Sequence, residues 1–364
     1  MTVRSTHRKH GIGTKNSQND DSLILAIESS CDETAVAVVR GGRRILSSEI
    51  ASQIEMHRIY GGVVPEIASR KHAEVIDGLS ALAIRNAGIS LADIDAVAVT
   101  FAPGLIGALL VGLNYAKGVA MALDVPLIPV HHIRGHVAAN YLAYPDLEPP
   151  FMCLVASGGH TLLLGVDGYT DYRVIGSTRD DAAGETFDKA ARVLGIGYPG
   201  GKVLDSLSAG ADPDAYLLPR AKVEGSPFDM SFSGLKTAII NLVHNAEQKG
   251  AELDLSGLAA SICKAISDQI VPRAVNACRE YGYKKLCAAG GVVANSVLRA
   301  DLAREASAAG LDLYVPPVSL CGDNAAMIGS QAFYEWAAGS IADMEINAYA
   351  TLSADYLFGK LISN

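Results

Sequence analysis

The sequence predicts an α/β protein built from two similar lobes with a cleft between them. The chain has 364 residues, which exceeds the size at which a single hydrophobic core usually stops growing. Short apolar runs typical of buried strands alternate with longer helical patterns. The order of three strands, helix, strand and helix occurs twice, which indicates a duplicated fold, although no residue-level repeat accompanies it.

The elements of the first half follow from apolar runs and from helix start and stop signals. Pro65 in the first turn and Gly88 just past the end delimit a long helical pattern. We expect strands at 23–28, 35–39 and 45–50, a helix at 65–87, a strand at 95–100, a helix at 105–122 and a strand at 126–130.

The second half repeats this order after Pro149-Pro150. We expect strands at 152–156, 162–166 and 172–176, a helix at 185–194 with further helices after it, a strand at 286–289, a helix at 294–308, a strand at 311–315 and a helix at 324–338. The predicted domains are an N-terminal lobe, 22–130, with 324–350 packing back on it, and a C-terminal lobe, 131–323. Residues 1–21 are polar and basic and are predicted to be a disordered tail, with a transit peptide as the alternative.

The composition restricts the functional classes. A net charge of −9 argues against an autonomous nucleic-acid-binding protein, which would carry a basic field. Six cysteines without a C-x-x-C pair are typical of reduced, buried thiols in a cytoplasmic protein. The longest apolar run, 103–116, is Gly-rich and is closed by Lys117, so no membrane association is expected.

A pair of histidines follows the predicted strand 126–130. His132 and His136 are four residues apart, so on a helix both imidazoles lie on one face and can reach one metal ion. A zinc protease with this spacing has Glu directly after the first His, and here that residue is Ile133. The alternative is that the histidines only cap or pack the helix.

Four turns lie where predicted strands end, the edge at which α/β folds gather ligands. Two are hairpins in equivalent positions of the two halves, and the glycines of the second leave backbone N–H groups free for an anion. Each turn taken alone is also compatible with a simple tight turn. The four turns are 29–34, 155–161, 289–295 and 321–324.

Together these motifs resemble the TsaD family, the tRNA adenosine threonylcarbamoyltransferases once described as O-sialoglycoprotein endopeptidases, of the actin-like/heat-shock/sugar-kinase (ASKHA) fold. The resemblance extends from about Leu23 to Ala338 and is of the bacterial type. Its motifs are 28–34, 61–66, 103–105, His132 with His136, 157–161, 180–189, 197–201, 229–236, 290–292 with Asn295, and 323–324.

The resemblance implies a metal site and a nucleotide site. His132, His136 and Asp323 would hold one divalent metal, iron or zinc, with coordination positions left open. The carboxylates of Asp188 and Asp205 would suit ribose hydroxyls, and Asn295 would lie at the adenine end. The residues of the expected nucleotide site are Val155, Ala156, Ser157, Gly158, Gly159, Asp188, Gly201, Asp205 and Asn295. Magnesium could accompany ATP or the adenylate.

The implied reaction transfers threonylcarbamoyl from threonylcarbamoyl-AMP to the exocyclic amine of the adenosine beside the anticodon in tRNAs that read ANN codons. Asp32 or Glu33 is our hypothesis for the base that takes the amine proton, with hairpin capping or magnesium binding as the alternative. The family resemblance also implies a TsaB-like paralogous subunit and a TsaE-like ATPase as partners. The alternatives are a non-catalytic scaffold subunit, a metalloprotease and an ATP-dependent phosphoryl transferase.

Several other residues are expected to have no direct role in the chemistry. His57, His72 and His244 are predicted to lie on the surface or on helix faces. A Cys31 thiolate would be disfavoured beside two carboxylates. His160 is expected to support the site. Arg134 stands where the family commonly has Glu, and we expect it to add positive charge near the metal.

Overall fold

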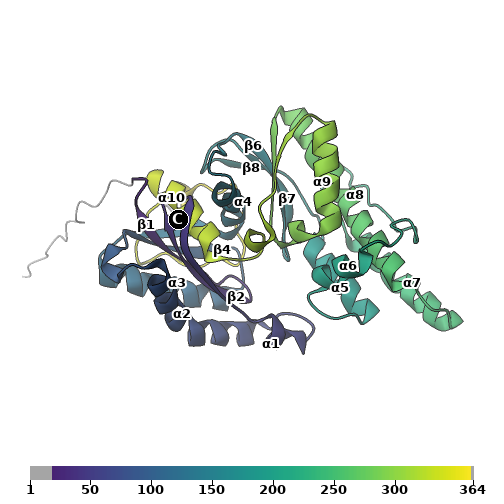
Figure 1. Ribbon diagram of the computed structural model, residues 1–364, viewed down its shortest axis with the longest axis horizontal. Helices are drawn as coiled ribbons and strands as arrows, with labels where there is room; N and C mark the ends of the chain where they lie inside the picture. The colour runs from purple at the N-terminus through teal and green to yellow at the C-terminus, as the bar shows by residue number, and fades with distance from the viewer. Residues whose placement is uncertain (1–18, 362–364) are drawn as a thin grey trace, which may run out of the picture.

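Two five-stranded sheets form two lobes that lie side by side in the computed structural model, which describes residues 19–361 (Figure 1). Most of the segment predicted as a disordered tail, 1–18, lies outside the described residues. Asn19 to Ser22 form a turn, in which the Ser22 amide donates to the Asn19 carbonyl at 2.9 Å.

The first sheet has the strand order β3-β2-β1-β4-β5. Its strands are β1 (Leu23–Glu28), β2 (Glu33–Arg40), β3 (Arg44–Ser52), β4 (Ala96–Ala102) and β5 (Leu127–His131). The first three strands are antiparallel, and β4 and β5 run parallel to β1. All six residues of β1 are buried, because helices cover both faces of this sheet.

Helices from distant parts of the chain cover the two faces of the first sheet. On one face lie α2 (Pro65–Ala87) and α3 (Ile106–Leu123), and α10 (Ala325–Ala337) packs on the other (Figure 1). Helix α2 begins at Pro65 and ends before Gly88, as predicted, and Gly88 adopts a left-handed φ of 69°. The short helix α1 (Ile54–Arg58) precedes α2.

Helix α3 continues past Lys117, where the sequence suggests that the apolar run closes. By length and composition alone it could therefore cross a bilayer. One such helix is weak support for a membrane span, since core helices pass the same test. Leu109, Leu113 and Ala116 of this helix pack into the core of the first lobe.

The second sheet repeats the topology of the first, with the order β10-β9-β6-β7-β8. Its strands are β6 (Phe151–Ala156), β7 (Thr161–Val166), β8 (Tyr172–Ser177), β9 (Lys285–Ala289) and β10 (Asp312–Tyr314). Again three antiparallel strands lead to two parallel ones. The predicted duplicated α/β fold is thus confirmed.

The helices of the second half pack around this sheet. They are α4 (His132–Ala143), α5 (Ala183–Leu194), α6 (Gly200–Ser208), α7 (Ser233–Lys249), α8 (Leu255–Tyr281) and α9 (Ser296–Ala308), with short 3-10 helices η2 (Gly291–Ala294) and η3 (Val318–Leu320) and, in the first lobe, η1 (Leu91–Asp93). The pair Gly290-Gly291 leads into the 3-10 turn η2, and α9 begins at Ser296, two residues after the start predicted for the helix 294–308. Helix α9 begins only after Asn295, whose side chain accepts from the Leu298 amide at 3.0 Å.

The sequence does not predict the structure beyond α10. Residues 349–361, here called the C-terminal segment, return along the first lobe and end in the short helix α11 (Phe358–Leu361). Tyr349 and Tyr356 pack edge-on against the buried ring of Phe101, with ring centroids 6.1 and 5.8 Å away. This segment thus belongs to the folded core.

Candidate metal centre

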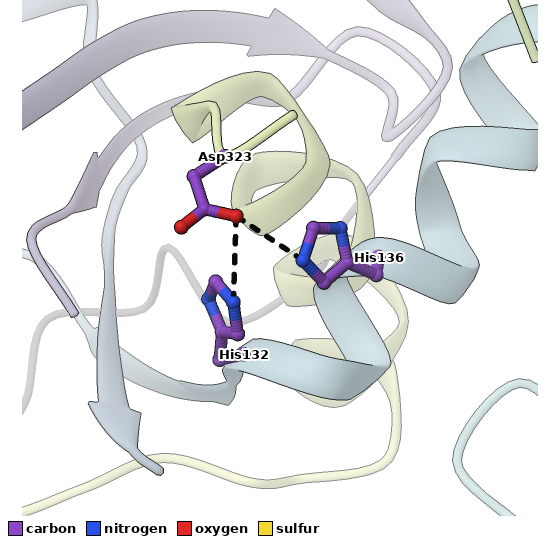
Figure 2. A group of neighbouring side chains, drawn as sticks. All are labelled: His132, His136 and Asp323. Carbon is purple, nitrogen blue, oxygen red and sulfur yellow. Dashed lines mark ion pairs between the residues drawn. The ribbon is translucent and has the colours of Figure 1, made fainter. Parts of the chain in front are cut away.

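Two imidazoles and one carboxylate converge where α4 and α10 begin. His132 is the first residue of α4 and His136 lies one turn later, with ring centroids 4.6 Å apart. Asp323 lies just before α10, and its Oδ1 is 3.6 Å from His132 Nε2 and 3.2 Å from His136 Nε2 (Figure 2). The three ligand atoms lie within 4.8 Å of one another, so the predicted trio is brought together.

The hydrogen bonding of His136 fits a metal ligand. The residue is fully buried: its Nε2 lies 3.2 Å from Asp323 Oδ1 without hydrogen-bond geometry, and its Nδ1 has no hydrogen-bond partner among the described residues. Buried polar atoms nearly always have such a partner. With two imidazoles and one carboxylate, the donor set suits iron or zinc and leaves coordination positions open.

A buried glutamate behind His132, Glu28, sets the orientation of its ring. Glu28 Oε2 lies 2.9 Å from His132 Nδ1. The same carboxylate accepts from the Ser30 amide at 2.5 Å and from Thr100 Oγ1 at 2.6 Å. A carboxylate on Nδ1–H turns Nε2 toward Asp323, which is how metal-binding histidines are usually oriented.

The sequence motifs did not indicate a role for Glu28. A signal was nevertheless present, because a glutamate ends a strand that is otherwise wholly apolar. A fully buried carboxylate needs hydrogen-bond partners and a compensating charge.

The charges of the metal-free cluster compensate one another. Burial lowers the pKa of His132, but the charges of Glu28 and Asp323 outweigh it and raise this pKa to about 9. Burial raises the pKa of Asp323, but the two neighbouring imidazoles outweigh it and hold this pKa well below its usual range. Burial, together with the charges of His132 and His136, lowers the pKa of His160 to about 4. His160 is therefore neutral and lies within the electrostatic reach of the trio.

The first hairpin places two carboxylates near this cluster. Burial raises the pKa of Glu33 to about 9, with contributions from the charges of Asp32 and Asp323. Ser52 Oγ donates to Glu33 at 3.1 Å. Burial and the Asp32 charge also raise the pKa of the Cys31 thiol, which agrees with the expectation that Cys31 is not a nucleophile.

Two glycine turns of the second lobe lie against each other. Gly290 has a φ of 95°, and a Cβ there would lie 2.3 Å from the Ala156 carbonyl oxygen, so only glycine fits. A Cβ on Gly158 or Gly159 would meet nothing within 4 Å, so the space beside these residues is open. Gly201 lies in the first turn of α6, where a Cβ would make only ordinary contact.

The polar residues of the expected nucleotide site fall into two groups. Asp188 Oδ1 accepts from the Gly200 amide at the start of α6, at 2.7 Å. Asp205 Oδ1 accepts from the amide and hydroxyl of Ser296 at 2.9 and 2.7 Å, next to Asn295. Asp188 and Asp205 therefore also stabilise the N-termini of α6 and α9. The sequence does not reveal this role.

Two of the three histidines expected on the surface or on helix faces are buried. His244 is exposed, but His57 and His72 are fully buried, so a surface position is wrong for both. His72 Nδ1 lies 2.7 Å from Thr34 Oγ1, and its Nε2 lies 2.9 Å from the Cys31 carbonyl oxygen. His72 therefore braces the first hairpin.

The expectation that Arg134 adds charge near the metal is also wrong. Residue 134 lies on the face of α4 opposite the metal ligands, and its guanidinium is paired with Glu335 at 2.9 Å. The positive charge is neutralised in a buried ion pair.

Fold and site define a two-lobed, duplicated α/β protein with a candidate metal centre where the helices α4 and α10 meet. The family model described as "TsaD: tRNA N6-adenosine threonylcarbamoyltransferase" matches residues 44–330. A protein of Clostridium botulinum (strain 657 / Type Ba4) called tRNA N6-adenosine threonylcarbamoyltransferase is 51% identical over 329 residues, covering 90% of this chain and 97% of its own length. A protein of the same name from Clostridium beijerinckii is 51% identical over 333 residues, with 92% and 98% coverage.

Solved structures agree on the fold. Full-length HypF in its phosphate- and nucleotide-bound form aligns with a TM-score of 0.58 at 16% identity, over 92% of this chain and 48% of that chain. Component A of the Acidaminococcus fermentans (R)-2-hydroxyglutaryl-CoA dehydratase aligns with a TM-score of 0.52 at 15% identity, over 87% and 99%. At this level of identity the likeness is one of fold, and it agrees with the predicted ASKHA fold.

The chain belongs to the TsaD family, as its motifs predicted. Its activity is that of a tRNA threonylcarbamoyltransferase, which forms threonylcarbamoyladenosine in tRNA. The family match favours this activity over the protease, scaffold and phosphoryl-transfer alternatives.

Proposed function

We propose that the transfer takes place beside the His132, His136 and Asp323 trio, with threonylcarbamoyl-AMP as donor and the adenosine beside the anticodon of ANN-reading tRNAs as acceptor. The observation that supports this most is the convergence of the three ligand atoms within 4.8 Å. The open turn around Gly158 leads to His160, whose carbonyl accepts from the Ser157 amide at 2.8 Å. Burial and the charges of His132 and His136 lower the pKa of His160, so this turn lies within electrostatic reach of the trio.

The residues of the second lobe would hold the donor. Backbone N–H groups of Ser157, Gly158 and Gly159 would bind its phosphate. The remaining carboxylate oxygens of Asp188 and Asp205 would face the ribose, and Asn295 the adenine. A magnesium ion could accompany ATP or the adenylate.

The metal ligands would leave open positions toward the donor. Bound iron or zinc would polarise the carbonyl or a phosphate oxygen of the donor as a Lewis acid. In the metal-free protein both ring nitrogens of His132 are protonated at neutral pH, because its pKa is about 9. The proton on the coordinating nitrogen must leave when the ring binds a metal.

Asp32 is the better candidate for the base that accepts the amine proton. Glu33 holds its own proton at neutral pH in the metal-free protein, because its pKa is about 9. Burial is the main cause that raises the pKa of Asp188 on the other lobe, and the charge of Asp32 adds to it. The charge of Asp32 therefore reaches a residue of the other lobe, and we propose that the acceptor adenosine binds beside Asp32.

Partner subunits would supply most of the affinity for tRNA. The net charge of −9 provides little attraction for a polyanion, so we propose a TsaB-like subunit and a TsaE-like ATPase in a cytoplasmic complex. We also propose the domain division 22–130 with 324–350, and 131–323.

The test is transfer of labelled threonylcarbamoyl from its adenylate to unmodified tRNA, with the partner subunits present. The double variant His132→Ala/His136→Ala should lose product and metal content together. His244→Ala, which removes an exposed histidine, is the matched control and should keep both. Full activity in the folded double variant would refute the proposed site, and absence of product with the wild-type protein would refute the proposed donor and acceptor.

A further inference from the structure

Arg134 lies at a junction of three elements. It is 2% exposed, and its Nη1 donates to Glu335 of α10 at 2.9 Å. Its Nε and Nη2 donate to the carbonyl oxygens of Ala354 and Tyr356 in the C-terminal segment, at 2.8 and 2.5 Å. The guanidinium also lies over the rings of Tyr356 and Tyr172, 4.1 and 4.7 Å from their centroids.

The residue that precedes α4 makes a second connection to the same segment. His131 Nε2 lies 3.1 Å from the Leu352 carbonyl oxygen, and its ring stacks on Tyr356 with centroids 5.6 Å apart. The Tyr349 amide donates to the Phe101 carbonyl at 2.9 Å, which ties the segment to the end of β4. The C-terminal segment therefore contacts the first turn of α4 through both His131 and Arg134.

The metal ligands lie on the opposite side of these contacts and come from two different elements. His132 and His136 belong to α4, whereas Asp323 lies at the start of α10. The distances between the ligand atoms therefore depend on the position of α4 relative to α10. The helices are in close contact, since a Cβ on Gly135 would lie 2.6 Å from Ile328 Cδ1. Metal sites require ligand distances held to within a few tenths of an ångström.

We propose that Arg134 is a positioning residue for the metal centre, because it joins α4, α10 and the C-terminal segment in one buried junction. The inference rests on the proposed metal site and extends it to residues that touch neither metal nor substrate. The C-terminal segment acts through Arg134 as a brace that keeps the two histidines facing Asp323.

The test measures Co²⁺ binding to the full-length protein by chelator competition and by the visible absorption of the bound ion. Arg134→Met should weaken Co²⁺ binding by about 10- to 100-fold, the usual effect of removing a residue that orients metal ligands, and should change the absorption band. Arg273→Met is the matched control: this half-buried arginine donates to the carbonyls of Asp229, Gln269 and Ala221 in the second lobe. It should leave Co²⁺ affinity and spectrum unchanged.

A second variant separates positioning from charge balance. Arg134→Met/Glu335→Met removes both members of the buried ion pair, an exchange that folded proteins often tolerate, but it also removes the hydrogen bonds to the C-terminal segment. We expect the fold to be retained while Co²⁺ binding stays weak.

Three outcomes would overturn the proposal. One is that Arg134→Met lowers thermal stability but leaves the affinity and absorption band of Co²⁺ unchanged. Another is that the double variant recovers wild-type affinity, which would reduce the role of Arg134 to charge compensation. Absence of Co²⁺ binding to the wild-type protein would refute the metal site itself, independently of whether tRNA is modified.

Discussion

The substitution Glu28→Gln tests how the protein prepares His132 for a metal. Glu28 is fully buried and accepts three hydrogen bonds, from the Ser30 amide, the Thr100 hydroxyl and His132 Nδ1. A glutamine has the same shape but replaces one oxygen with a donor. That donor cannot face the Ser30 amide, so it must take the position of Oε2, opposite His132 and Thr100.

The consequence is a change in the imidazole. With an amide N–H opposite it, Nδ1 of His132 must accept, and the ring proton moves to Nε2, the atom 3.6 Å from Asp323. A protonated Nε2 cannot bind a metal. The substitution replaces a hydrogen bond to a charged group, whose contribution is about 1.5–3 kcal/mol, so the metal dissociation constant should rise about 10- to 100-fold.

The measurement is Co²⁺ affinity at pH 7.5 by chelator competition, with thermal unfolding in EDTA as a check of the fold. Glu28→Asp is the control that keeps the charge while shortening the side chain, and it should bind Co²⁺ more tightly than Glu28→Gln. An affinity of the glutamine variant within twofold of wild type would show that Glu28 does not set the His132 tautomer.

Three further predictions concern stability and catalysis. Burial lowers the pKa of His72 below its ordinary value of 6.5, so below that pH the unfolded chain binds a proton that the native protein does not. Urea unfolding should therefore show stability falling as pH drops from 7 to 5, and His72→Gln should flatten this slope. Gly135→Ala would place a Cβ 2.6 Å from Ile328 Cδ1 and should destabilise the protein by about 1–3 kcal/mol. On α3, Gly118→Ala meets nothing within 4 Å and should stabilise by about 0.5–1 kcal/mol; equal effects in urea unfolding would contradict the packing argument. Asp32→Asn should lower the transfer rate about 10²- to 10⁴-fold without loss of donor binding, and unchanged turnover on bound donor would exclude it as the base.

Local sequence signals predicted much of the fold. Pro65 and Gly88 delimit α2 because both act within one turn of the backbone. His132 and His136 were placed together by helix periodicity alone. Asp323 is almost two hundred residues away, and the resemblance to a family was needed to include it.

The errors have a common physical origin in long-range packing. His72 shares the buried face of α2 with Ala68 and Ile76, one turn before and after it, so the spacing did indicate burial, but a polar side chain was taken to be exposed. The surroundings of Arg134 could not be predicted, because its partners lie in a C-terminal segment that has no regular periodicity. Both residues depend on contacts far along the chain.

The return of α10 to the first sheet affects when the first lobe can complete its folding during synthesis. Ala325, Ile328 and Trp336 cover one face of that sheet, although the five strands that form it end at His131. On the ribosome, this apolar face therefore stays uncovered until about two hundred further residues have been synthesised. Exposed sheet surface of this kind is prone to aggregation, so the nascent first lobe is a natural client for chaperones until α10 emerges.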